Sequence, residues 1–131
     1  MSVPIKLVIA TTTFLLMSQS VFAFSINFNW GDIRLCTSGN PGIIDNPAFT
    51  LNDVPAGTSK IRFKLVDLNV PSYIHGGGTI SYSGQTKVAR GAFRYKSPCP
   101  PNGRHTSQWS AVAFDAQGKA LAIATAKRQY P

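Results

Sequence analysis

The chain predicts an all-β protein, built as an antiparallel sandwich or barrel with little or no helix. Apolar and polar residues alternate in several short segments, and turn-forming residues separate these segments at short intervals. No stretch shows a convincing helical period. Short strands at this spacing are typical of sandwiches and barrels.

Residues 1–23 are predicted to be a cleaved signal peptide. The positive charge of Lys6 precedes a short apolar run, and Ala23 ends the segment in the pattern of a cleavage site. The run is shorter than the roughly 20 apolar residues that a membrane-spanning helix needs. A retained N-terminal anchor is the alternative. Residues 24–131 are then expected to form one exported domain, periplasmic or secreted, with no transmembrane segment.

The strands of this domain are expected where alternation or apolar character is clearest. In the first, Phe24, Ile26, Phe28 and Trp30 lie on one face because side chains alternate along a strand. The expected strands, in order, are Phe24–Trp30, Lys60–Leu65, Thr79–Tyr82, Gly91–Tyr95, Gln108–Phe114 and Ala120–Thr125.

Asp67 continues the inward phase of Ile61, Phe63 and Leu65. A regular strand would therefore direct its carboxylate into the interior or toward a pocket wall. A buried carboxylate without a partner costs several kcal/mol, so Asp67 is expected to pair with His75 or His105. The alternative is that the strand ends at Val66 and that Asp67 caps a turn.

Cys36 and Cys99 are the two cysteines of the chain. Export makes a disulfide between them chemically feasible, and closing so long a loop would contribute on the order of 3–5 kcal/mol. Two buried thiols are the alternative. A reactive cysteine is a third reading, for which only Lys96 and Arg104 offer nearby positive charge.

The formal charge of the chain is +8, which becomes +7 when Lys6 is removed with the signal peptide. The domain contains no Glu and five Asp. Such a surface favours anionic partners, namely phosphate groups, acidic lipids or acidic glycans. The alternative is that the high charge only keeps the protein soluble. Nucleic acid is not expected as a partner, because there is no dense run of Lys and Arg.

Three segments together resemble the phosphatidylethanolamine-binding protein family, in particular its bacterial Raf-kinase-inhibitor-like branch. The first contains a Cys, an Asn-Pro pair and a Val-Pro-Ala-Gly-Thr run. The second is an Asp-containing turn with a downstream His, and the third is a Pro-rich turn that ends in His. The segments that carry the resemblance are Cys36–Thr58, Asp67–His75 and Ser97–Asp115, with the tail Ala120–Tyr130.

The resemblance implies a β-sandwich with a small anion-binding pocket at one end. Carried over to this chain, the pocket residues are Asp67, His75, Pro98 and His105. The chain departs from the family pattern in several places: the Asp turn has Leu68 and Asn69 in place of Pro and Asp, glycines follow His75, and the pocket Tyr is absent. The chain is therefore expected to be a trimmed member with a shallower and more open pocket.

The expected function is that of an exported, non-catalytic binding module for a small anion such as phosphate or a phospholipid headgroup. A glycine run beside His75 could bring backbone N–H groups close to an anion. The alternative is a structural, protein-interaction or inhibitor module with a vestigial pocket. An enzyme is not expected, because no nucleophile elbow occurs and Ser107 lacks a readable base. A metal site at Asp67, His75 and His105 is disfavoured by their spacing, and no cofactor is expected.

Overall fold

The computed structural model describes residues 1–6, 9, 13–16 and 23–131. Much of the predicted signal peptide, residues 7–8, 10–12 and 17–22, lies outside the described residues. The described part of the chain contains nine strands and no helix. Accordingly, it contains no helix long and apolar enough to span a bilayer. The strands are β1 (Ser25–Phe28), β2 (Ile43–Asp45), β3 (Phe49–Asn52), β4 (Lys60–Asp67), β5 (Gly77–Ser81), β6 (Lys87–Val88), β7 (Arg94–Lys96), β8 (His105–Phe114) and β9 (Ala120–Tyr130).

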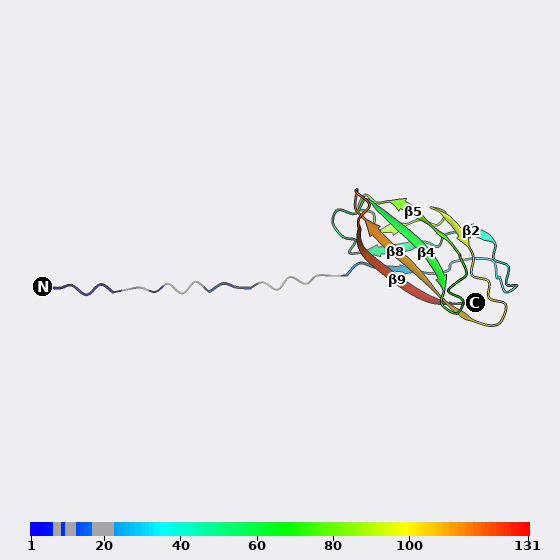
Figure 1. Cartoon of the computed structure of the whole chain (residues 1–131), viewed down its shortest axis with the longest axis horizontal. Helices are drawn as coiled ribbons and strands as arrows, with labels where there is room; N and C mark the ends of the chain where they lie inside the picture. The colour runs from blue at the N-terminus through cyan, green and yellow to red at the C-terminus, as the bar shows by residue number, and fades with distance from the viewer. Residues whose placement is uncertain (7–8, 10–12, 17–22) are drawn as a thin grey trace.

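The strands form a four-stranded sheet in the order β5-β4-β8-β9, a three-stranded sheet in the order β1-β3-β6, and the pair β2-β7. All pairings are antiparallel. In Figure 1 the long strands β4, β8 and β9 run side by side, and the described N-terminal residues extend away from the β domain. The predicted all-β antiparallel architecture is confirmed.

The core lies between the sheets and is rich in aromatic side chains. Ile61, Phe63 and Leu65 of β4 are at most 1% exposed, as their alternation predicted. Phe49 of β3 reaches across to the large sheet, with its ring centroid 4.6 Å from that of Phe63 and 5.3 Å from that of Trp109. Small residues on β8 and β9 leave room for these rings: Ala111, Ala113 and Ala124 are all buried. Aromatic contacts thus join the two sheets.

The short strands were harder to predict than the long ones. β2, β3 and β6 were not expected, although β3 supplies Phe49 to the core. The strand expected at Gly91–Tyr95 was placed too early, because Gly91 has a φ of +87° and pairing begins only at Arg94. The strand Ala120–Thr125 was expected too short, since β9 continues to Tyr130.

Two of the three glycines after His75, Gly77 and Gly78, have a packing role, and none of the three lines the cavity beside His75. A Cβ at Gly77 would come within 1.8 Å of the Phe63 carbonyl oxygen, and one at Gly78 within 2.4 Å of Phe93 Cβ. Real contacts of this kind do not fall below 3.0 Å. Gly77 and Gly78 are therefore required for β5 to lie against β4 and Phe93.

The predicted disulfide is confirmed. Cys36 and Cys99 are joined across a sequence separation of 63 residues. Cys36 N–H also donates a hydrogen bond of 2.8 Å to the Tyr130 hydroxyl. The region before β2 is thereby fixed to the Pro-rich loop and to the end of β9.

We expect Gly77→Ala to lower the free energy of unfolding by about 1–3 kcal/mol, because the new methyl group meets a backbone oxygen that cannot move independently. Gly42→Ala is the matched control, since its Cβ would meet nothing within 4 Å, and its effect should stay within about 0.5 kcal/mol. Urea denaturation measures both. Equal effects in the two variants would contradict the packing role of Gly77.

The disulfide is expected to contribute about 4 kcal/mol through the constraint it places on the unfolded chain. The Cys36→Ser, Cys99→Ser double variant should lose this amount of unfolding free energy in denaturant melts. A reducing agent should lower the stability of the wild-type protein to that of the double variant and leave the variant unchanged. A loss below about 1 kcal/mol would show that the bond does not stabilise the fold.

Candidate functional site

The candidate site is a cavity of about 230 Å³ where β4 ends and β8 begins. Asp67, His75 and His105 all line this cavity. The register explains how β4 and β8 bring two of them together: Asp67 lies opposite Ser107, and His105 is two residues earlier on the same strand. Side chains two residues apart in a strand share a face, so Asp67 and His105 are neighbours.

Asp67 is 9% exposed, and each of its carboxylate oxygens accepts hydrogen bonds. Oδ2 accepts from His105 Nδ1 at 2.6 Å. Oδ1 accepts from the backbone N–H groups of Asn69 and Val70, at 2.9 and 3.3 Å. The strand continues to Asp67 and the carboxylate pairs with His105, as the inward phase predicted, so the alternative that the strand ends at Val66 is wrong. The other carboxylate oxygen also caps the turn that follows β4.

His75 reaches the cavity from the segment before β5 and is 5% exposed. Its Nδ1 lies 2.8 Å from the carbonyl oxygen of Lys96. Because a carbonyl oxygen only accepts, His75 Nδ1 carries a hydrogen, and the same holds for His105 Nδ1 against the ionised Asp67. In the described part of the chain, Nε2 of each ring has no hydrogen-bond partner. Each imidazole is thus oriented through Nδ1, and its other nitrogen is available to a ligand.

The fourth predicted residue, Pro98, is buried but does not line the cavity. The Pro-rich loop contributes Pro100 and Pro101 instead, beside Cys99 of the disulfide. A second part of the wall contains Gly39 and Pro41. Gly39 N–H donates to the Cys99 carbonyl at 3.1 Å. The disulfide and this backbone bond hold the two parts together.

Sequence reasoning missed Val70 and Tyr73, which also line the cavity. The Tyr73 ring lies 4.6 Å from the His75 ring, and the Lys96 ammonium lies 5.7 Å from the Tyr73 ring centroid. One feature of the sequence indicates that Tyr73 belongs to the site: it lies between the Asp67 turn and His75, which both line the cavity. Although the family's pocket Tyr is absent, another Tyr from a different segment borders this cavity.

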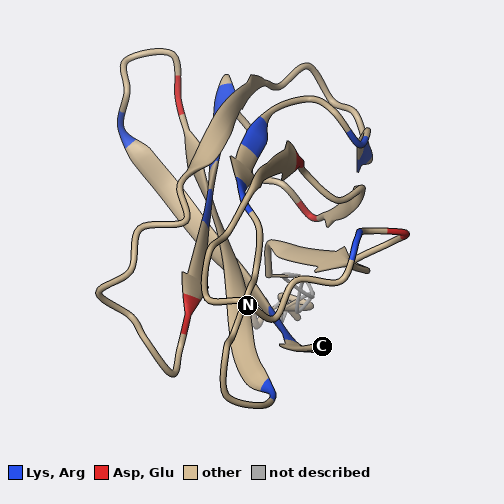
Figure 2. Ribbon diagram, turned by 90° about the vertical axis from the view of Figure 1, so that its right-hand side faces the viewer, with Lys and Arg blue, Asp and Glu red and all other residues tan. Residues whose placement is uncertain are grey.

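The charge around the cavity is set by few groups. Asp67 is the only carboxylate among the lining residues, and it is paired with His105. Figure 2 shows Lys and Arg spread over the domain, with few acidic positions. Outside the cavity, burial raises the pKa of Tyr95 well above its usual range, and nearby Tyr130 raises it further. Tyr95 is therefore neutral and adds no charge near Lys96.

We expect both neutral imidazoles to occupy the tautomer with hydrogen on Nδ1. Ring nitrogen chemical shifts measured by NMR report the tautomer directly. In Asp67→Ala, His105 should lose this preference because its acceptor is gone, while His75 keeps it through the Lys96 carbonyl. The opposite tautomer at His105 in the wild-type protein would contradict the pairing with Asp67.

A scan against protein-family models finds no match, and a search of the curated proteins finds none. Among solved structures, the chain is similar to the crystal structure of a phosphatidylethanolamine-binding protein homolog from Chlamydia trachomatis, with a TM-score of 0.59 and 18% sequence identity. The match covers 83% of this chain and 97% of that one. At this identity the likeness establishes the fold. The chain has the sandwich fold of a phosphatidylethanolamine-binding protein homolog, as the three sequence segments predicted.

Proposed function

We propose that the protein is an exported, non-catalytic binding module that accepts a small phosphate-bearing anion in the cavity at Asp67, His75 and His105. The observation that carries this proposal is the pair of imidazoles oriented through Nδ1 in one cavity. Each has Nε2 available as a donor when protonated. Charge-assisted hydrogen bonds of this kind are about twice as strong as neutral ones.

Asp67 contributes to the proposed site by positioning His105. Its Oδ2 accepts a hydrogen bond from His105 Nδ1 at 2.6 Å. This bond orients the imidazole and leaves its Nε2 for the anion. Loss of Asp67 would therefore leave His105 without a fixed orientation.

The size of the cavity limits the ligand. About 230 Å³ is smaller than the roughly 300–1,000 Å³ typical of pockets for drug-sized ligands. A phosphate group or a compact headgroup matches this volume, whereas an acyl chain would have to remain outside. Ligands of this kind include free phosphate and phosphoethanolamine.

Export and the absence of catalysis are parts of the same proposal. The disulfide is of a kind that persists in oxidising compartments, which supports a periplasmic or secreted location. Ser107, the residue weighed as a nucleophile, is 1% exposed. A nucleophile must reach its substrate, and so its burial supports a binding role.

A second candidate function is a protein-interaction module. The segment between β4 and His75 exposes four large apolar side chains. Exposed apolar side chains that cluster in this way mark interaction surfaces in many proteins. Their exposed fractions range from 37% to 75%; the residues are Leu68, Val70, Tyr73 and Ile74. Such a rim fits a protein partner that covers the cavity mouth.

Titration of the purified protein with inorganic phosphate and then phosphoethanolamine tests the first proposal. Saturable shifts of both imidazole resonances are expected in NMR spectra. Asp67→Ala and His75→Gln should each weaken binding at least about tenfold.

Asp115→Ala is the matched control, because Asp115 also caps a turn, between β8 and β9. Its phosphate affinity should equal that of the wild-type protein. Unchanged ring resonances up to millimolar phosphate and phosphoethanolamine would overturn the anion site and leave the interaction module as the better account.

A further inference from the structure

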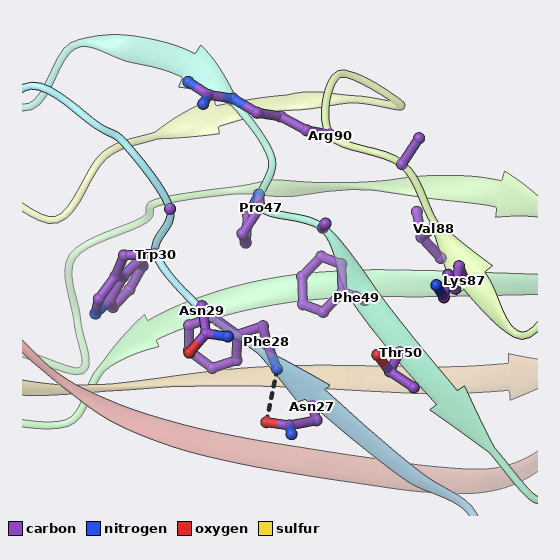
Figure 3. A pocket seen from close by; sticks show the side chains of 13 residues that line it. Asn27, Phe28, Asn29, Trp30, Pro47, Phe49, Thr50, Lys87, Val88 and Arg90 are labelled. Atoms are coloured by element: carbon purple, nitrogen blue, oxygen red, sulfur yellow. Dashed lines mark hydrogen bonds between the residues drawn. The ribbon is translucent and has the colours of Figure 1, made fainter.

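A second and larger cavity lies on the β1-β3-β6 sheet, away from Asp67 and both histidines. Its volume is about 550 Å³, within the range of pockets that hold small organic ligands. It shares no lining residue with the smaller cavity. Figure 3 shows that β1 and β3, the loop after β1 and the segment after β6 surround it.

Trp30 gives this cavity an aromatic wall with a defined orientation. Its ring lies 5.1 Å from the Phe28 ring and 5.6 Å from the Tyr130 ring, in edge-to-face contacts. Its Nε1–H donates a 2.9 Å hydrogen bond to the Gln129 carbonyl. Three contacts therefore hold an indole that is only partly buried. A fixed, partly exposed indole loses little conformational entropy when a flat apolar group packs against it.

The charged lining residues are both cationic, Lys87 and Arg90, and no carboxylate lines the cavity. Figure 3 shows the Arg90 side chain extending from the segment after β6 toward the chain that follows Trp30. There its Nη1 donates to the Asp32 carbonyl at 3.4 Å. Among the described residues Arg90 forms no ion pair. Its remaining N–H groups can pair with an anion, since a guanidinium has five donors.

We propose that this cavity is a second binding site, for a small organic anion with a flat apolar body. The apolar body packs against Trp30 and Pro47, and its carboxylate, sulfonate or phosphate pairs with Arg90. Asn27, Asn29 and Thr50 are also lining residues and supply neutral hydrogen-bonding groups. This site does not depend on the proposed phosphate site, because none of its residues is shared.

The test compares an anionic fluorescent probe, anilinonaphthalene sulfonate, with phenylnaphthylamine, a neutral probe of similar shape. The sulfonate should bind one-to-one and saturably, and the neutral probe at least about tenfold more weakly. Arg90→Gln should reduce the difference in affinity between the two probes, because it removes the charge that pairs with the sulfonate. Lys127→Gln, which removes an exposed cation on β9 outside the cavity, is the control and should leave binding unchanged.

The two tryptophans locate the probe. Trp30 lines the cavity, whereas Trp109 is 0% exposed in the core. The Trp30 indole N–H resonance should shift on binding more than that of Trp109, while the imidazole resonances of His75 and His105 stay unchanged. Thermal melts verify that Arg90→Gln remains folded. Equal affinity for both probes, no effect of Arg90→Gln, or shifts at the histidines instead of Trp30 would each overturn the proposal.

Discussion

The pairing of β4 with β8 is the constraint on which the rest of the molecule depends. These strands pair over the whole length of β4, from Lys60 opposite Phe114 to Asp67 opposite Ser107. Side chains alternate with a period of two, so the phase that buries Ile61, Phe63 and Leu65 also turns Asp67 inward. The core and the candidate site are therefore successive parts of a single strand. A one-residue slip would expose the core and remove the carboxylate from the cavity together.

The sequence predicts most of this arrangement because β4 and β8 alternate strongly and lie in the centre of the four-stranded sheet. The inward phase of β4 could be extended to Asp67, and burial then required a partner, which is His105. β2, β3 and β6 have four residues or fewer, too few to show a period. Their pairing depends on tertiary contacts such as those of Phe49 with Phe63 and Trp109, which local sequence does not display.

The residues of the site were predictable where a strand pattern or a family motif indicates their position, and not where an irregular loop carries them. The inward phase of β4 predicts Asp67, with His75 or His105 as its partner, and the resemblance also points to both histidines. Tyr73, Pro100 and Pro101 reach the cavity through loop conformations, and loops have no periodic signal. For the glycines after His75, the sequence pattern was visible but had two interpretations. Their composition fits both a backbone anion site and close strand packing, and the distances to Phe63 and Phe93 explain Gly77 and Gly78 by packing.

The disulfide connects the location of the protein to the geometry of its smaller cavity. Cys99 is itself a lining residue, and the bond to Cys36 holds the Pro100–Pro101 wall near the wall that contains Gly39 and Pro41. A domain of this size has a small core with which to hold two loops together. If the bond is reduced, the two segments lose their covalent link and keep the backbone hydrogen bonds from Gly39 to Cys99 and from Ser97 to Gly42, together with the pairing of β2 and β7. An oxidising compartment would therefore favour a formed cavity as well as a stable fold, and the proposed export and the proposed binding role support each other for this physical reason.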